Sequence, residues 1–168
     1  GLFTQGMVCH ETYKNNEGKW LSPDQIKKSD EGLVSKIDSS KVVVGPSEAM
    51  SKSKKNIVDP ESMIKIYGAD AVRWFILSDS PPERDVQWST EGVSAAHKFI
   101  QRLWTLNNKI LQKKDEKSDP QDEKRFLTKF NDYIYKISEL IEKFQLNVTV
   151  AKIHELTNLF EDNLNKKL

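Results

Sequence analysis

Residues 122–144 have the sequence DEKRFLTKFNDYIYKISELIEKF, in which large apolar side chains recur every three or four positions. That spacing places them on one face of an α-helix and predicts a helix over about 122–144. Shorter stripes with the same period predict helices over about 90–112 and 148–163. We interpret these stripes as core packing and not as a cofactor site, and we expect the three helices to form an antiparallel bundle.

Short strands are expected ahead of these helices. The β-branched run at residues 41–44 predicts a strand that ends at Gly45-Pro46 and leads into an exposed loop. Residues 2–9 and 20–21 are further candidate strands, and residues 22–28 carry the Ser-Pro start of one short turn or helix. The first part of the chain is therefore predicted to contain a small β element.

Two short helices and a linker connect the β element to the bundle. Asp59-Pro60 supplies a helix cap and a first-turn proline, and Gly68 ends that helix. A second short helix is expected over 69–77, and residues 113–122 form a charged linker. The predicted class is α+β, mainly α, with the β element followed by the helical bundle.

Composition narrows the function classes. The chain has 168 residues, a formal net charge of +1, 30% charged residues and one cysteine. These values exclude whole-chain disorder, a disulfide framework and a cysteine-rich zinc site, and they argue against nucleic-acid binding by net charge alone. No apolar run is long enough for a membrane span, and the start lacks the features of a signal peptide. We expect a cytoplasmic protein, and the abrupt ends suggest a segment of something longer.

The stretch SEAMSKSKKN, residues 47–56, has the residue types that suit a polyphosphate ligand. Three lysines in four positions provide positive charge, and the serines among them provide hydrogen-bond donors. The helix expected from Asp59 would add free backbone N–H groups just beyond the loop. The alternative interpretation is a solvated basic loop without a ligand.

Residues 49–53, Ala-Met-Ser-Lys-Ser, resemble the Lys-Met-Ser-Lys-Ser signature loop of class I aminoacyl-tRNA synthetases. Lys54-Lys55-Asn56 favours the leucyl branch, since the valyl and isoleucyl relatives usually have Leu-Gly-Asn there. Several flanking stretches are similar to leucyl-tRNA synthetases of the bacterial type: TQGMV (4–8), VVVG (42–45), KKNIVDP (54–60), YGADAVR (67–73), SPPE (80–83), EGV (91–93) and RLW (102–104).

The resemblance implies a two-step reaction. Leucine and ATP, with Mg²⁺ expected on the nucleotide, give leucyl-adenylate, and the leucyl group then passes to tRNA(Leu). Lys52 would be the catalytic residue that binds ATP, with Ser51 and Ser53 orienting the loop or contacting phosphate. Met50 would anchor the loop by apolar packing, and Ala49 stands where the family normally has lysine. Either Lys54 or Lys55 compensates, or activation is slower, or the missing lysine mainly sets the conformation of the loop.

The resemblance also divides the chain. Residues 1–86 would finish the catalytic domain, with a leucine-specific insertion at about 10–40 and the signature loop at 49–53. Residues 87–168 would be part of an anticodon-binding-type helical bundle that lies along tRNA. Phosphate contacts are assigned to three residues of the first bundle helix, with a solvated basic face as the alternative: Lys98, Arg102 and Lys109.

The chain lacks the His-Ile-Gly-His sequence that class I synthetases also require, and the hydrolytic editing domain is absent. By itself it is therefore expected to be inactive. The rival hypothesis is a stand-alone RNA-binding helical module without catalysis. Neither DNA nor a membrane is an expected partner.

A few other polar residues have simpler interpretations. Cys9, His10 and Glu11 are adjacent on an expected strand, so their side chains alternate between its faces and no metal site is predicted. His97 and His154 lie in predicted helices, where packing is the expected role. Asp70 and Arg73 are three positions apart on one helix and are expected to form a local ion pair.

Overall fold

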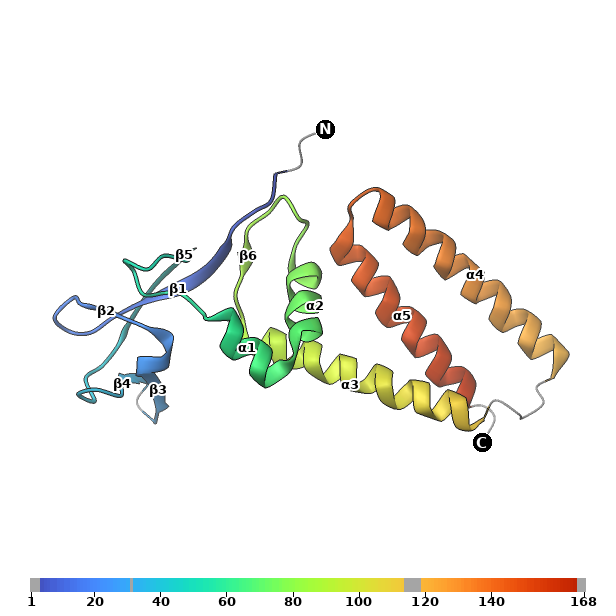
Figure 1. Cartoon of the computed structure of the whole chain (residues 1–168), viewed down its shortest axis with the longest axis horizontal. Helices are drawn as coiled ribbons and strands as arrows, with labels where there is room; N and C mark the ends of the chain where they lie inside the picture. The colour runs from blue at the N-terminus through green and yellow to red at the C-terminus, as the bar shows by residue number, and fades with distance from the viewer. Residues whose placement is uncertain (1–3, 31, 114–118, 166–168) are drawn as a thin grey trace.

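The computed structural model describes residues 4–30, 32–113 and 119–165 of the chain. The molecule is elongated, with strands at one end, two short helices in the middle and a helical hairpin at the other end (Figure 1). The predicted α+β, mainly α class is confirmed. The elements are β1 (Val8–Lys14), β2 (Trp20–Leu21), β3 (Ile26–Ser29), β4 (Gly32–Ser35), β5 (Val43–Ala49), α1 (Pro60–Tyr67), α2 (Ala69–Asp79), β6 (Val86–Gln87), α3 (Thr90–Gln112), α4 (Pro120–Glu142) and α5 (Leu146–Asn165).

Strand β1 organises the larger sheet. It pairs antiparallel with β5 and with β2, and its first two residues pair in parallel with β6. Strands β3 and β4 form a separate antiparallel hairpin. The sheet therefore joins β6, which leads into the long helices, to the end of β5, where the signature loop begins.

The prediction that the strand ends at Gly45-Pro46 is wrong, because β5 continues to Ala49. The pairing skips one residue between Glu11 and Thr12, so Pro46, which has no N–H to donate, needs no place in the ladder. A Cβ on Gly45 would lie 2.5 Å from the Thr12 hydroxyl oxygen, so a side chain there would have to displace the buried Thr12. Because of this bulge, β5 continues through Gly45-Pro46, a dipeptide that usually ends a strand.

Two other local predictions differ from the structure. Strand β1 begins at Val8 and not at residue 2; residues 1–3 lie outside the described part, and the Gly6 N–H already bonds to the carbonyl of Pro82 at 2.9 Å. Of the short turn or helix expected over 22–28, one 3₁₀ turn is present, and it ends at residue 25. The residues after it pair with β4 instead, so a long-range partner overrides the local helix signal.

The helices agree closely with their sequence signals. Helix α3 has the predicted bounds, and α1 is capped by Asp59 and followed by Gly68, which has a φ of +84°. Helix α4 begins two residues earlier than expected because Asp119 caps it, accepting from the Gln121 N–H at 2.7 Å, with Pro120 in the first position. Residues 114–118 of the predicted linker at 113–122 lie outside the described residues, and residues 120–122 belong to α4.

The main core lies where α2, β6 and α3 meet. Its five buried side chains are those of Ala71, Phe75, Val86, Val93 and Ala96. A second contact joins three helices, because Trp74 of α2 stacks on Phe99 of α3, and His154 of α5 lies 3.7 Å from the Phe99 ring. The middle of the chain and the bundle are thus continuous in packing.

The end of the bundle is less well covered. Helices α4 and α5 form an antiparallel hairpin (Figure 1) joined by the rings of Phe126, Phe130 and Phe160. No residue of α4 is buried, and Trp104 of α3 is 70% exposed. Over the described residues, no helix has the length and apolar character needed to cross a membrane.

Candidate functional site

The signature loop, residues 49–53, leaves the sheet at the end of β5. Ala49 still pairs with Cys9 of β1, and the Met50 N–H donates to the carbonyl of Val8 at 3.2 Å. A turn follows, in which the Lys55 N–H donates to the carbonyl of Lys52 at 3.3 Å. The first two residues of the loop are therefore fixed to the sheet, and the other three project beyond it.

The side chains of Ser51 and Ser53 form hydrogen bonds within the turn. The hydroxyl oxygens of Ser51 and Ser53 lie 3.1 Å apart, and the Ser51 hydroxyl also accepts from the Lys54 N–H at 3.3 Å. Ser53 is exposed, whereas Ser51 is half-buried. The Ser51 side chain thus holds the turn, and Ser53 remains accessible to a ligand.

Asn56 is the residue that sequence reasoning missed. Its side chain is completely buried, although it follows a run of polar residues. Its Oδ1 accepts from the Ser51 N–H at 2.8 Å, and its Nδ2 donates to the carbonyls of His10 at 3.2 Å and Glu48 at 3.1 Å. No local sequence signal could reveal this, because one of the partners lies 46 positions away along the chain.

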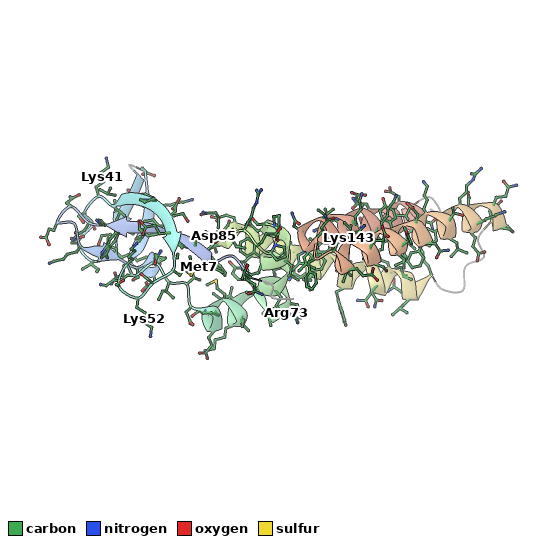
Figure 2. The ribbon with its side chains drawn as sticks, turned by 90° about the horizontal axis from the view of Figure 1, so that it is seen from above. Met7, Lys41, Lys52, Arg73, Asp85 and Lys143 are labelled. Carbon is green, nitrogen blue, oxygen red and sulfur yellow. The ribbon has the colours of Figure 1, made fainter. Side chains whose placement is uncertain are left out.

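The three lysines differ in their surroundings. Lys54 forms an ion pair with Glu48. Lys52 and Lys55 are exposed, and neither forms an ion pair within the described ranges. Figure 2 shows Lys52 pointing away from the strands into solvent. Two positive charges are therefore available to an anion at this end of the sheet, and the third is largely neutralised by Glu48.

The N-terminus of α1 does not add the free N–H groups that were expected. The Asp59 carboxylate accepts from the Glu61 N–H at 3.2 Å and from the Ser62 N–H at 3.0 Å. The Ser62 hydroxyl and these two N–H groups also lower the pKa of Asp59, so its negative charge stays at the helix end. The expectation is wrong because the residue that starts the helix also occupies its anion site.

Of the three residues predicted to contact tRNA, Arg102 has an intramolecular role. Its Nε and terminal nitrogen donate to the two carboxylate oxygens of Glu161 at 2.8 and 2.6 Å, and it also bonds to Asn158. Hydrogen bonding to Glu161 raises the pKa of Arg102, and the same bond lowers the pKa of Glu161. Lys98 and Lys109 are exposed, and their spacing from Arg102 places all three along one side of α3.

The remaining polar residues show packing contacts. His97 lies 2.8 Å from the carbonyl of Tyr67, and His154 packs on Phe99, which confirms the packing roles expected of both histidines. Arg73 and Asp70 are paired at 3.5 Å, also as predicted. In the part of the chain that the structure describes, no three His, Cys, Asp or Glu residues are grouped so that they could hold a metal ion.

Comparison with protein families gives matches along the chain. The family model described as tRNA synthetases class I (I, L, M and V) matches residues 39–89, which include the signature loop. The chain is 47% identical over 161 residues to the leucine–tRNA ligase of Zymomonas mobilis, and 45% identical over 166 residues to that of Maricaulis maris. These alignments cover 96% and 95% of this chain, which confirms its resemblance to leucyl-tRNA synthetases.

The same alignments cover only 19% of each relative, so the chain spans about a fifth of the length of the curated relatives it matches. Among solved structures, it resembles the ternary complex of Agrobacterium radiobacter K84 agnB2 LeuRS with tRNA and LeuAMS. The TM-score is 0.62, and the match covers 71% of this chain and 16% of that one. The sequence identity is 24%, so this likeness establishes the fold alone.

Proposed function

We propose that this chain is a segment of a leucine–tRNA ligase, which activates leucine with ATP and transfers it to tRNA(Leu). The observation that carries the proposal is Lys52, an exposed lysine without an ion pair in the described ranges, at the position of the signature's second lysine. Its loop is part of a chain 47% identical to a leucine–tRNA ligase. A solvated basic loop would need neither that sequence nor the buried anchor beneath it.

In the proposed reaction, the leucine carboxylate attacks the α-phosphorus of ATP and pyrophosphate leaves. The residues of this chain contribute charge and position. Lys52 neutralises negative charge on the leaving pyrophosphate, and such charge stabilisation is a main source of catalysis in nucleotidyl transfer. Ser51 maintains the turn, the exposed Ser53 hydroxyl is available to phosphate, and Met50 and Ala49 connect the loop to the sheet.

The absence of the signature's first lysine is explained best by compensation from Lys55. Lys54 is paired with Glu48, which reduces the charge it offers to phosphate. Lys55 is exposed and lies in the same turn as Lys52. We therefore assign the second positive charge of the site to Lys55. Mg²⁺ is expected on the nucleotide, and no residue of this chain is assigned to it.

The division of the chain follows from the same proposal. Residues 1–86 finish the catalytic domain, and residues 87–168 begin the anticodon-binding-type bundle. Lys98 and Lys109 are the proposed phosphate contacts of that bundle, because Arg102 is already bonded to Glu161. Separated from the rest of the enzyme, the 168 residues are expected to form no leucyl-adenylate, since they lack the His-Ile-Gly-His sequence.

The test is leucine-dependent ATP–pyrophosphate exchange by the full-length protein. We expect Lys52→Ala to lower kcat about 10- to 100-fold, since a charge-assisted bond to phosphate is worth roughly 1.5–3 kcal/mol. The matched control is Lys41→Ala, which removes another exposed lysine of the β region and should leave kcat within about twofold (Figure 2). Exchange that is absent from the wild-type protein, or unchanged in Lys52→Ala, would contradict the proposal; salt-dependent tRNA binding without exchange would favour the RNA-binding module.

A further inference from the structure

We propose that Asn56 is a positioning residue for adenylate formation, which holds the signature loop in the orientation that presents Lys52 to the ATP phosphates. This inference rests on the proposed function. Asn56 is completely buried, so its side chain cannot itself contact a nucleotide. Any effect it has on the reaction must pass through the loop that it holds.

The hydrogen bonds of Asn56 join three segments. Its Nδ2 bonds to carbonyls of two neighbouring strands, His10 in β1 and Glu48 in β5, while its Oδ1 bonds to the N–H of Ser51 in the loop. Buried amides are costly unless both their donor and acceptor are paired, and here both are. These bonds therefore fix the loop relative to the sheet and not only relative to its own turn.

The bond to Ser51 acts one residue before Lys52. The fixed N–H of Ser51 sets the direction of the backbone that enters Lys52, and the Ser51 hydroxyl then accepts from the Lys54 N–H. Without Asn56, the remaining anchors to the sheet would be the pairing of Ala49 with Cys9, the Met50 backbone bond and the Lys54–Glu48 ion pair. None of these three joins Ser51, Lys52 or Ser53 to the sheet, and the other bonds of these residues lie within the turn itself.

The residue before Asn56 gives a second observation. Lys55 has a φ of +54°, a left-handed conformation that residues with a branched or long side chain rarely adopt. Such a conformation persists where surrounding contacts determine it, and these residues often lie at functional sites. The buried side chain of Asn56 follows this residue directly and bonds to carbonyls of β1 and β5. The left-handed residue thus lies at the point where the turn returns to the sheet.

The experiment is a double-mutant cycle in the full-length protein, measured by leucine-dependent ATP–pyrophosphate exchange. We expect Asn56→Ala to lower kcat at least tenfold while the KM for leucine stays within twofold. Because Asn56 acts on the loop that carries Lys52, the loss in the double variant should be smaller than the product of the two single losses. A kcat for Asn56→Ala within twofold of wild type, or losses that multiply in the double variant, would overturn the inference.

Two further measurements separate positioning from folding. Transfer of leucine from preformed leucyl-adenylate to tRNA should stay within twofold of wild type in Asn56→Ala, because that step no longer involves pyrophosphate. An equal loss in both steps would assign Asn56 a merely structural role and overturn the inference. If Asn56→Ala does not fold, Asn56→Asp keeps the acceptor for Ser51 but loses the amide donor; the same selective fall in kcat is expected, and an unchanged kcat would overturn the inference.

The two proposals fail in different ways. If the wild-type protein shows no leucine-dependent exchange, the proposed function is wrong. If wild type exchanges and Lys52→Ala does not, while Asn56→Ala behaves as wild type, only the positioning role is wrong.

Discussion

Gly92 lets helix α3 lie directly against the ring of Phe75 in the main core. A Cβ at this position would lie 2.5 Å from one ring carbon of Phe75, whose side chain is buried and contacts Trp88 edge-on. Because that ring is enclosed, it cannot move aside without disturbing the packing of α2 on α3. The first turn of α3 can therefore pack this closely on Phe75 only because Gly92 has no side chain.

We expect Gly92→Ala to lower the free energy of unfolding by about 1–3 kcal/mol, the usual cost of overpacking a core. The higher helix propensity of alanine would offset only about 1 kcal/mol of the loss. Urea denaturation followed by circular dichroism measures the change. Ala95→Ser, at an exposed position of the same helix, is the control and should change stability by less than about 0.5 kcal/mol. If Gly92→Ala were as stable as the wild type or more stable, the Phe75 ring would be able to move aside without cost.

Among elements, α3 and α5 are joined by the ion pair between Arg102 and Glu161. The two side chains are 39% and 34% exposed, so solvent screening reduces the strength of the pair. We expect Glu161→Gln to lower stability by about 0.5–1 kcal/mol at pH 7. Glu142→Gln, at an exposed residue of α4 without an ion pair within the described ranges, should have a smaller effect.

The pH dependence of this pair has a definite sign. The bond to Arg102 lowers the pKa of Glu161 below its ordinary value of 4.5 in the folded chain. Its stabilising contribution is therefore complete above pH 4.5 and is lost as the pH falls through the lower, folded pKa. The stability difference between wild type and Glu161→Gln should shrink on acidification in urea titrations. A difference that grows below pH 4.5 would mean that the carboxylate is not the stabilising form.

Helix α3 and strand β5 differ in how well their bounds could be predicted from the sequence. Helix α3 was predicted with its observed bounds because its apolar period and its ends are local signals. The end of β5 was not, because a bulge opposite Thr12 carries the strand through Pro46. Lys52 could be proposed as a site residue from resemblance and stays a prediction. The bonds of Asn56 could not be predicted, since they are made to carbonyls of two strands that the fold brings together.

At the scale of the whole molecule, large apolar side chains remain exposed on the bundle. Trp104 and Leu111 of α3 are 70% and 57% exposed, and Leu127, Ile134 and Ile141 recur every seven residues on α4 with 43–51% exposure. Exposed apolar surface of this kind favours association with other apolar surfaces. The chain spans about a fifth of the length of the relatives it matches. Under the proposed function, we expect further parts of the enzyme to pack on these faces.

We therefore expect the 168-residue chain on its own to self-associate as its concentration rises, because contact between copies removes these side chains from water. Sedimentation velocity over a hundredfold concentration range should show a rising average mass. Replacing Trp104 and Leu111 by lysine should keep the chain monomeric over more of that range. The matched control replaces Thr105 and Asn108, which are exposed on the same helix, by lysine; it adds the same charge but removes no apolar surface, so association should persist. A wild-type chain that stays monomeric throughout, or a control that dissociates equally, would show that charge or another surface governs association.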